Sequence, residues 1–164
     1  VATVGGIRRE FGPGALVVPD QIIDYTWGRA STFFEGAGAK VTHIDFTEPY
    51  TAALRARILA AARACGEAIA DGGCYGTTQG PRLETAAEIA RMERDGADLV
   101  GMTAMPEAAL AREAGLEYAA IAVVANHAAG KGDSARAISL SALETVVQQA
   151  MQRVRRILEK LAAS

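Results

Sequence analysis

The chain has 164 residues, of which 50% are hydrophobic and 22% are charged, and its formal net charge is −2. This length is sufficient for a domain with a buried core. The chain lacks the excess of basic residues that is typical of general nucleic-acid-binding proteins, which argues against that class. The longest apolar run, around residues 119–125, is shorter than the roughly 20 residues of a membrane-spanning helix, and the first residues lack a secretory-leader pattern. We therefore expect residues 1–164 to form a single cytoplasmic domain with neither nucleic-acid nor membrane partners.

The first part of the chain is rich in β-forming residues. The predicted strands there are residues 1–4, 15–19 and 41–44. Residues 47–49, Thr-Glu-Pro, have the pattern of a helix start, with an N-cap residue and an early proline. An Ala-, Leu- and Arg-rich helix is predicted from there to about residue 70.

The second half alternates between strands and helices. Predicted strands are residues 74–79, 98–103 and 118–126, and predicted helices are residues 83–95, 106–115 and a long C-terminal helix with a capping-box pattern at Ser141 and Glu144. The run at 118–126 is almost continuously apolar, which is typical of a strand covered on both faces. The alternation predicts an α/β fold with three αβα layers and a mixed, largely parallel sheet.

Polar or unusual side chains stand where the predicted strands end. Ligands of parallel α/β sheets bind beyond the carboxyl ends of the strands, so parallel neighbours would bring Glu84, Met102, Thr103 and Asn126 to one pocket. This set supplies a carboxylate, a thioether, a hydroxyl and an amide, without a Ser/His/Asp triad or a cluster of metal ligands. Spacing alone predicts a small-molecule site and no more.

Each of these residues also has a purely structural interpretation. Glu84 would favour the dipole of a helix in whose first turn it lies, and Met102 would fill the core. Thr103 would cap or turn the chain, and Asn126 would be a turn residue. The histidines His43 and His127 are more often structural than catalytic.

Three segments of the sequence, taken together, resemble a known enzyme family. Residues 78–85, 96–107 and 122–126 resemble the trimeric purine nucleoside phosphorylase and methylthioadenosine phosphorylase family. Residues 20–24 and 43–50 resemble its methylthio branch, so that the resemblance extends over nearly the whole chain in the family's order. No single segment is specific, but their joint occurrence is.

The resemblance implies phosphorolysis, in which inorganic phosphate attacks the anomeric carbon of a nucleoside and the purine leaves. Thr103 and, less specifically, Thr3 would hold phosphate, while Met102 would lie under the ribose and Leu83 would also contact the substrate. A group that stabilises the charge developing on the purine is also required. Asn126 would fill this role by donating to purine N7.

The same resemblance indicates which nucleoside is used. Asn126 together with Glu84, which would accept from a ring N–H, is typical of 6-oxopurine sites. Residues 137–143 lack the histidine that binds a free 5′-hydroxyl, and Leu140 and Leu143 would form an apolar wall for a methylthio group. The implied substrate is 5′-methylthioinosine. The alternatives are methylthioadenosine or inosine/guanosine phosphorolysis, hydrolysis, or nucleoside binding without activity.

His43 matches a family position that reaches into the site of a neighbouring subunit, which implies a homotrimer; the alternative is a loop histidine with local partners. The glycine-rich phosphate loop, the Arg-His segment and the N-terminal strands of the family have no counterpart, so the chain resembles the C-terminal two-thirds of that domain. The phosphate site is therefore expected to be incomplete. Neither a metal nor an organic cofactor is expected, and the resemblance implies inorganic phosphate as a cosubstrate.

Overall fold

A seven-stranded sheet with the order β3-β5-β6-β1-β7-β2-β4 organises the computed structural model, which describes residues 1–138 and 140–163 but not the side chains of 140–142. The strands are β1 (Ala2–Gly6), β2 (Leu16–Val18), β3 (Gln21–Asp24), β4 (Ala70–Asp71), β5 (Cys74–Thr77), β6 (Leu99–Gly101) and β7 (Ala122–His127). The pairs β1·β7, β2·β4, β3·β5 and β5·β6 are parallel, whereas β1·β6 and β2·β7 are antiparallel. The predicted α/β fold with a mixed, largely parallel sheet is confirmed.

The sheet is curled, so that its two edges approach each other. The N–H of Gly72, after β4, donates to the Val18 carbonyl at 2.9 Å, and the N–H of Asp20, before β3, donates to the Gly73 carbonyl at 3.2 Å. Side chains on the inner face form a core of their own, which consists of Ala2, Val4, Phe11, Val17, Tyr75, Leu99, Ala104, Ala122 and Val124. The outer face is left for helices and for the cavity described below.

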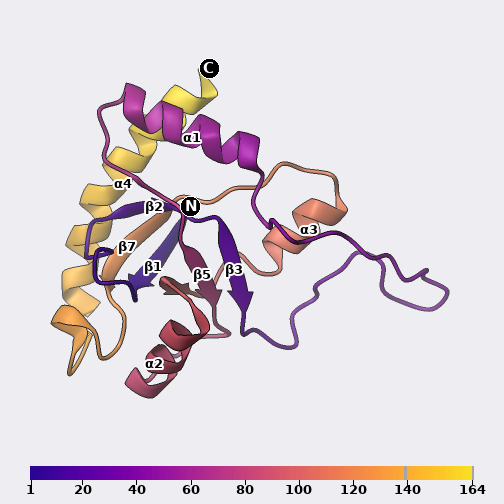
Figure 1. Cartoon of the computed structure of the whole chain (residues 1–164), viewed down its shortest axis with the longest axis horizontal. Coiled ribbons are helices and arrows are strands. Elements are labelled where there is room, and N and C mark those ends of the chain that lie inside the picture. Colours follow the sequence, from indigo (N-terminus) through magenta and orange to yellow (C-terminus); the bar gives the residue numbers. More distant parts are fainter. Residues whose placement is uncertain (139, 164) are drawn as a thin grey trace.

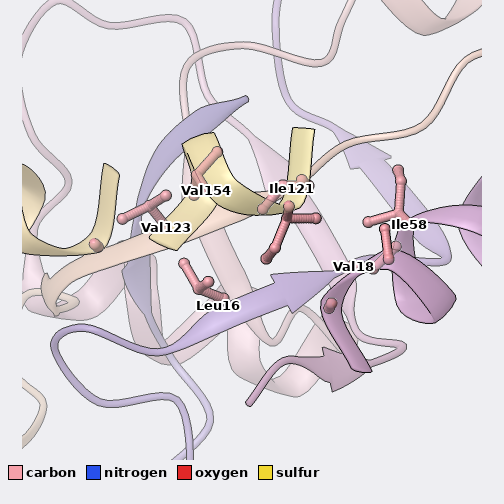
Figure 2. Packing of buried hydrophobic residues seen from close by; sticks show 10 residues of the cluster. Leu16, Val18, Ile58, Ile121, Val123 and Val154 are labelled. Atoms are coloured by element: carbon pink, nitrogen blue, oxygen red, sulfur yellow. The ribbon is translucent and has the colours of Figure 1, made fainter. Parts of the chain in front are cut away.

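Helices surround the sheet (Figure 1), and their bounds are α1 (Ala52–Ala64), α2 (Ala86–Asp95), α3 (Glu107–Glu113), the 3₁₀ turn η1 (Gly132–Ser134) and α4 (Leu140–Ala162). Figure 2 shows the core between α1, α4 and the strands β2 and β7, where Ile58 and Val154 pack with Leu16 and Val123. Each such fully buried side chain contributes about 1.5–3 kcal/mol to folding. Within the described residues, no helix is both long and apolar enough to cross a membrane.

Capping residues and glycines set the ends of α2 and α3. Thr85 caps α2 and forms a capping box with Glu88, and Gly96 ends this helix in the left-handed conformation with φ +98°. The predicted end of α3 at Gly115, with φ +68°, also agrees. The predicted cap at Ser141 falls inside α4, and the side chain of this residue lies outside the described part.

Two expectations for the first half are wrong. No strand forms at 41–44, because the side chain of Val41 is 75% exposed and finds no neighbouring strand; the whole segment 25–51 lacks helix and strand. Helix α1 begins at Ala52 rather than at residues 47–49, and it ends at Ala64 because Gly66 takes a left-handed conformation, φ +69°. Strand β3 was not predicted, since its residues are only partly buried at the sheet edge.

Candidate active site

A cavity of about 400 Å³ lies on the outer face of β1. Its walls come from the loop before α2, the residues after β6, the end of β7 and the start of α4. The lining residues are Val1, Ala2, Thr3, Val4, Gly5, Leu83, Glu84, Val100, Gly101, Met102, Thr103, Ala125, Asn126, Ala128, Ala129, Ile138 and Leu143. The site thus joins segments that are far apart in the sequence.

Of the strands that end at this site, β5 and β6 are the parallel neighbours that were expected, but β6 and β7 are not neighbours. β1 lies between β6 and β7, and it runs antiparallel to β6, with Gly5 opposite Val100. The cavity therefore extends along β1 instead of lying beyond a common row of strand ends. Gly5 contributes to the space, because a Cβ atom there would meet Val100 Cγ1 at 3.2 Å.

Most of the residues predicted for the site line this cavity, namely Thr3, Leu83, Glu84, Met102, Thr103, Asn126 and Leu143. His43 is not among the lining residues; it is exposed on the segment 25–51, which extends from the body of the molecule past α3 (Figure 1). The side chain of Leu140 lies outside the described residues.

Glu84 is held by a threonine. It lies directly before the cap of α2, so the predicted position in the first helical turn is wrong. The Thr78 hydroxyl donates to Glu84 Oε1 at 2.7 Å and lies 3.2 Å from the Gly101 carbonyl. The backbone N–H of Thr78 also donates to this carbonyl, at 2.8 Å. The carboxylate is therefore fixed against the end of β5.

Thr103 is held by a buried tyrosine. The Tyr75 hydroxyl lies 3.1 Å from Thr103 Oγ1 and accepts from the Thr103 N–H at 3.4 Å. The two hydroxyls share a hydrogen bond in which either one can donate. Burial raises the pKa of Tyr75 above its ordinary value, which favours the protonated phenol.

Asn126 and Met102 lie on different walls. The side-chain amide of Asn126 donates to the His127 carbonyl at 2.6 Å, and since an NH₂ group has two N–H bonds, this contact uses one of them. Met102 packs against Gly80, where a Cβ atom would come within 2.5 Å of Sδ. The wall that Met102 forms thus depends on a glycine at position 80.

Arg29 joins two loops of the site. Its guanidinium donates to the carbonyls of Thr78 and Gln79, each at 3.1 Å, and also to the carbonyl of Met105. One of these loops carries Thr78, which supports Glu84, and the other carries Thr103, which lines the cavity. Arg29 belongs to the segment 25–51, so this segment positions the site as well as extending from the body.

The sequence interpretation missed several contributors. Thr78, Tyr75 and Arg29 act behind the lining residues, and only the path of the loops reveals them. Ile138 lines the cavity directly. Residues 137–143 lack a histidine, and their leucines are predicted to form an apolar wall. The same pattern therefore includes Ile138 as a candidate lining residue beside Leu143.

The charges around the cavity are sparse. None of the described residues that line it is Lys or Arg. Among the described residues, no group of three or more His, Cys, Asp or Glu side chains is arranged for a metal ion. His127 follows Asn126, and its Nδ1 lies 3.8 Å from Asp133 Oδ2, outside the cavity lining. The described lining is mainly apolar, and its polar side chains are two hydroxyls, one amide and one carboxylate.

Comparison with known proteins shows which family the chain belongs to. Residues 1–163 match the family described as the phosphorylase superfamily. The chain belongs to the phosphorylase superfamily. Its resemblance to the purine nucleoside and methylthioadenosine phosphorylases, which rested on residues 78–85, 96–107 and 122–126, is thereby confirmed.

Relatives within the phosphorylase superfamily carry specific names. The chain is 66% identical over 132 residues to a probable S-methyl-5′-thioinosine phosphorylase of Xanthomonas campestris, covering 80% of the chain and 53% of that protein. A protein of the same name from Pseudomonas syringae is 51% identical over 164 residues, all of the chain and 66% of the relative. The chain thus spans about half to two-thirds of the length of these relatives.

Solved structures of the superfamily show the same fold. The methylthioadenosine phosphorylase of Schistosoma mansoni with adenine superposes with a TM-score of 0.92 at 29% identity, covering 99% of the chain and 63% of that structure. A mutant of the Schistosoma enzyme in complex with methylthioadenosine gives a TM-score of 0.89 at 29% identity, with 99% and 62% covered.

Proposed function

We propose that the protein phosphorolyses the N-glycosidic bond of 5′-methylthio purine nucleosides, with methylthioinosine as the preferred substrate. The products are hypoxanthine and 5-methylthioribose 1-phosphate, as in purine salvage. The observation that carries the proposal is that one cavity is lined by Glu84, Asn126, Thr103 and Leu143. These residues supply what a base, a phosphate and an apolar 5′ group each require.

The base contacts follow from the donors and acceptors of a 6-oxopurine. Such a base has an N–H at position 1 and an acceptor at N7. The carboxylate of Glu84 accepts, and the amide of Asn126 donates. Because N7 gains electron density as the glycosidic bond breaks, a donor placed there binds the transition state more strongly than the ground state.

The sugar contacts favour a methylthio group over a hydroxyl. Ile138 and Leu143 line the same cavity as the residues assigned to the base. Met102 is assigned to the underside of the ribose. A buried 5′-hydroxyl would lose its hydrogen bonds against this apolar wall, whereas a thioether has none to lose.

The bond changes are those of a substitution at the anomeric carbon. A phosphate oxygen forms the new bond to C1′, the bond from C1′ to N9 breaks, and its electron pair stays on the purine, which takes up a proton. Thr103 and Thr3 line the cavity and are assigned to phosphate. None of the described lining residues is cationic, so we infer that other parts of the active assembly supply the positive charge that strengthens phosphate binding.

We assign the protein to a homotrimer in which His43 covers the sugar of a neighbouring site. His43 is exposed and distant in sequence from the cavity segments, and it shares the segment 25–51 with exposed Trp27, Phe33 and Val41. Exposed apolar side chains grouped on one segment are typical of a protein–protein contact. The partner would be a second copy of this chain.

The experiment is a phosphate-dependence assay with methylthioinosine. It uses the chain as printed and, where the reading frame continues upstream of Val1, the longer product. Hypoxanthine release and 5-methylthioribose 1-phosphate are measured with and without phosphate. Release that needs phosphate supports the proposal. Equal release without phosphate would indicate a hydrolase, and nucleoside binding without turnover in both forms would indicate a binding protein.

A further inference from the structure

Thr78 stands behind Glu84 and is not itself part of the cavity lining. Its hydroxyl donates to Glu84 Oε1 at 2.7 Å. Its backbone N–H donates to the Gly101 carbonyl at 2.8 Å, which fixes Thr78 to β6. Arg29 holds the Thr78 carbonyl at 3.1 Å. Thr78 is therefore held at both its backbone N–H and its backbone carbonyl. It can act as a rigid support for the carboxylate.

The hydroxyl has one proton and two acceptors within reach. The Gly101 carbonyl lies at 3.2 Å and Glu84 Oε1 at 2.7 Å. A carboxylate is the stronger acceptor, and the shorter distance agrees with donation to Glu84. With Oε1 engaged in this way, Glu84 has Oε2 left for a ligand.

This arrangement matters for the base because an ionised carboxylate only accepts hydrogen bonds. A 6-oxopurine presents an N–H at position 1, which such an oxygen can bind. A 6-aminopurine presents a lone pair at the same position, which the oxygen repels. Discrimination between the two bases therefore depends on the orientation of Glu84 as well as on its identity.

We propose that Thr78 is a specificity-determining positioning residue, whose hydroxyl holds Glu84 so that the second carboxylate oxygen meets the N1–H of a 6-oxopurine. This inference rests on the proposed function, because it assigns Glu84 to the base. Thr78 does not touch the substrate; it acts through the carboxylate.

The test compares Thr78→Val, which removes the hydroxyl at nearly constant shape, with Thr78→Ser, which retains it. The values of kcat/KM are measured for methylthioinosine and methylthioadenosine. Thr78→Val is expected to lower kcat/KM for methylthioinosine about tenfold, mainly through KM, and to change that for methylthioadenosine by less than about twofold. Thr78→Ser is expected to stay within about twofold of wild type for both nucleosides.

A double-mutant cycle separates positioning from general damage to the fold. In the Glu84→Gln background, Thr78→Val is expected to have little further effect on the ratio of kcat/KM for methylthioinosine to kcat/KM for methylthioadenosine. The reason is that the hydroxyl then has no carboxylate to hold. Urea unfolding midpoints of all variants are recorded beside the kinetics. An equal loss for both nucleosides, no loss, or a Thr78→Ser variant as impaired as Thr78→Val would each overturn the inference.

A binding measurement keeps this inference separate from the proposed function. Titration calorimetry with hypoxanthine and adenine does not depend on turnover. If the wild-type protein does not phosphorolyse methylthioinosine, the proposed function fails. The hypoxanthine-to-adenine affinity ratio of Thr78→Val still decides on Thr78, with a fall of about tenfold expected and an unchanged ratio contradicting it.

Discussion

The hydroxyl of Tyr75 lies 3.1 Å from the hydroxyl of Thr103, and it joins the closed interior of the sheet to the open cavity. Tyr75 is almost completely buried on β5, whereas Thr103 is exposed after β6. The N–H of Thr103 donates to the same tyrosine oxygen. A buried and rigid residue thus orients the hydroxyl that is proposed to bind phosphate.

Tyr75→Phe removes this orientation while the ring remains in place. We expect the KM for phosphate to rise about three- to tenfold, equivalent to roughly 1 kcal/mol, with little change in the KM for the nucleoside. Steady-state kinetics at varied phosphate measure this. Tyr118→Phe is the control, because Tyr118 stacks on Tyr50 and is absent from the cavity lining. A rise in the nucleoside KM alone would contradict the role given to Thr103.

Gly80→Ala changes the wall that Met102 forms. The new Cβ would lie 2.5 Å from Met102 Sδ, and φ is +66°, a conformation that costs a non-glycine residue about 1–2 kcal/mol. We expect a lower free energy of unfolding and a higher KM for the nucleoside. Gly115→Ala is the control, because φ is +68° there and its Cβ meets nothing within 4 Å. It should lose similar stability without a change in KM.

Glu88 gives the start of α2 a pH dependence. A bidentate ion pair with Arg82 and the capping hydrogen bond from the Thr85 N–H lower the pKa of Glu88 from 4.5 to about 2. The unfolded chain therefore binds more protons than the folded one between these values, so that stability falls as the pH decreases through this range. Glu88→Gln retains the cap but loses the ion pair.

Urea unfolding of wild type and Glu88→Gln between pH 2 and pH 6 measures this dependence. The stability difference in favour of wild type should be full above about pH 4.5 and should shrink as the pH approaches 2. A difference that does not change with pH would mean that the ion pair contributes nothing to folding.

The segment 25–51 should govern the oligomeric state. Phe33 and Val41 are 64% and 75% exposed. We expect Phe33→Ser/Val41→Ser to convert a trimer into monomers while stability changes by less than about 0.5 kcal/mol, because the side chains are exposed within one subunit. Light scattering coupled to size-exclusion chromatography measures the mass. The control is Leu116→Ser, also 64% exposed but on the loop after α3. A wild-type monomer, or an unchanged mass in the double variant, would contradict the trimer.

The sequence could predict the elements whose signals are local. The apolar run of β7 and the glycines at the ends of α2 and α3 are short-range patterns, whereas the capping box of Thr85 and Glu88 was not predicted. β3 was missed because its residues are only partly buried, and 41–44 was overpredicted because an apolar alternation forms a strand only where a neighbour pairs with it. Burial of a strand depends on contacts that are distant in the sequence.

The residues of the candidate site could be predicted from the sequence, but their arrangement in space could not. Glu84, Met102, Thr103 and Asn126 were predicted from their places at the strand ends, the family resemblance added their roles, and all four line one cavity. The insertion of β1 between β6 and β7 was not predictable from spacing, since pairing between β1 and β6 joins residues nearly a hundred positions apart. The support that Thr78 gives Glu84 depends on the path of the loop between them.

The central claim is a preference for a 6-oxopurine nucleoside with a 5′-methylthio group, and a direct comparison of kcat/KM for methylthioinosine, methylthioadenosine and inosine in phosphate buffer tests it. Methylthioadenosine differs from methylthioinosine at the base, and inosine differs from it at the 5′ group. Each difference should lower kcat/KM by at least about tenfold, because unpaired polar groups are left in the cavity. Methylthioinosine is therefore predicted to exceed both other nucleosides. A higher kcat/KM for methylthioadenosine would contradict the role of Glu84 and Asn126, and a higher value for inosine would contradict the apolar wall of Ile138 and Leu143.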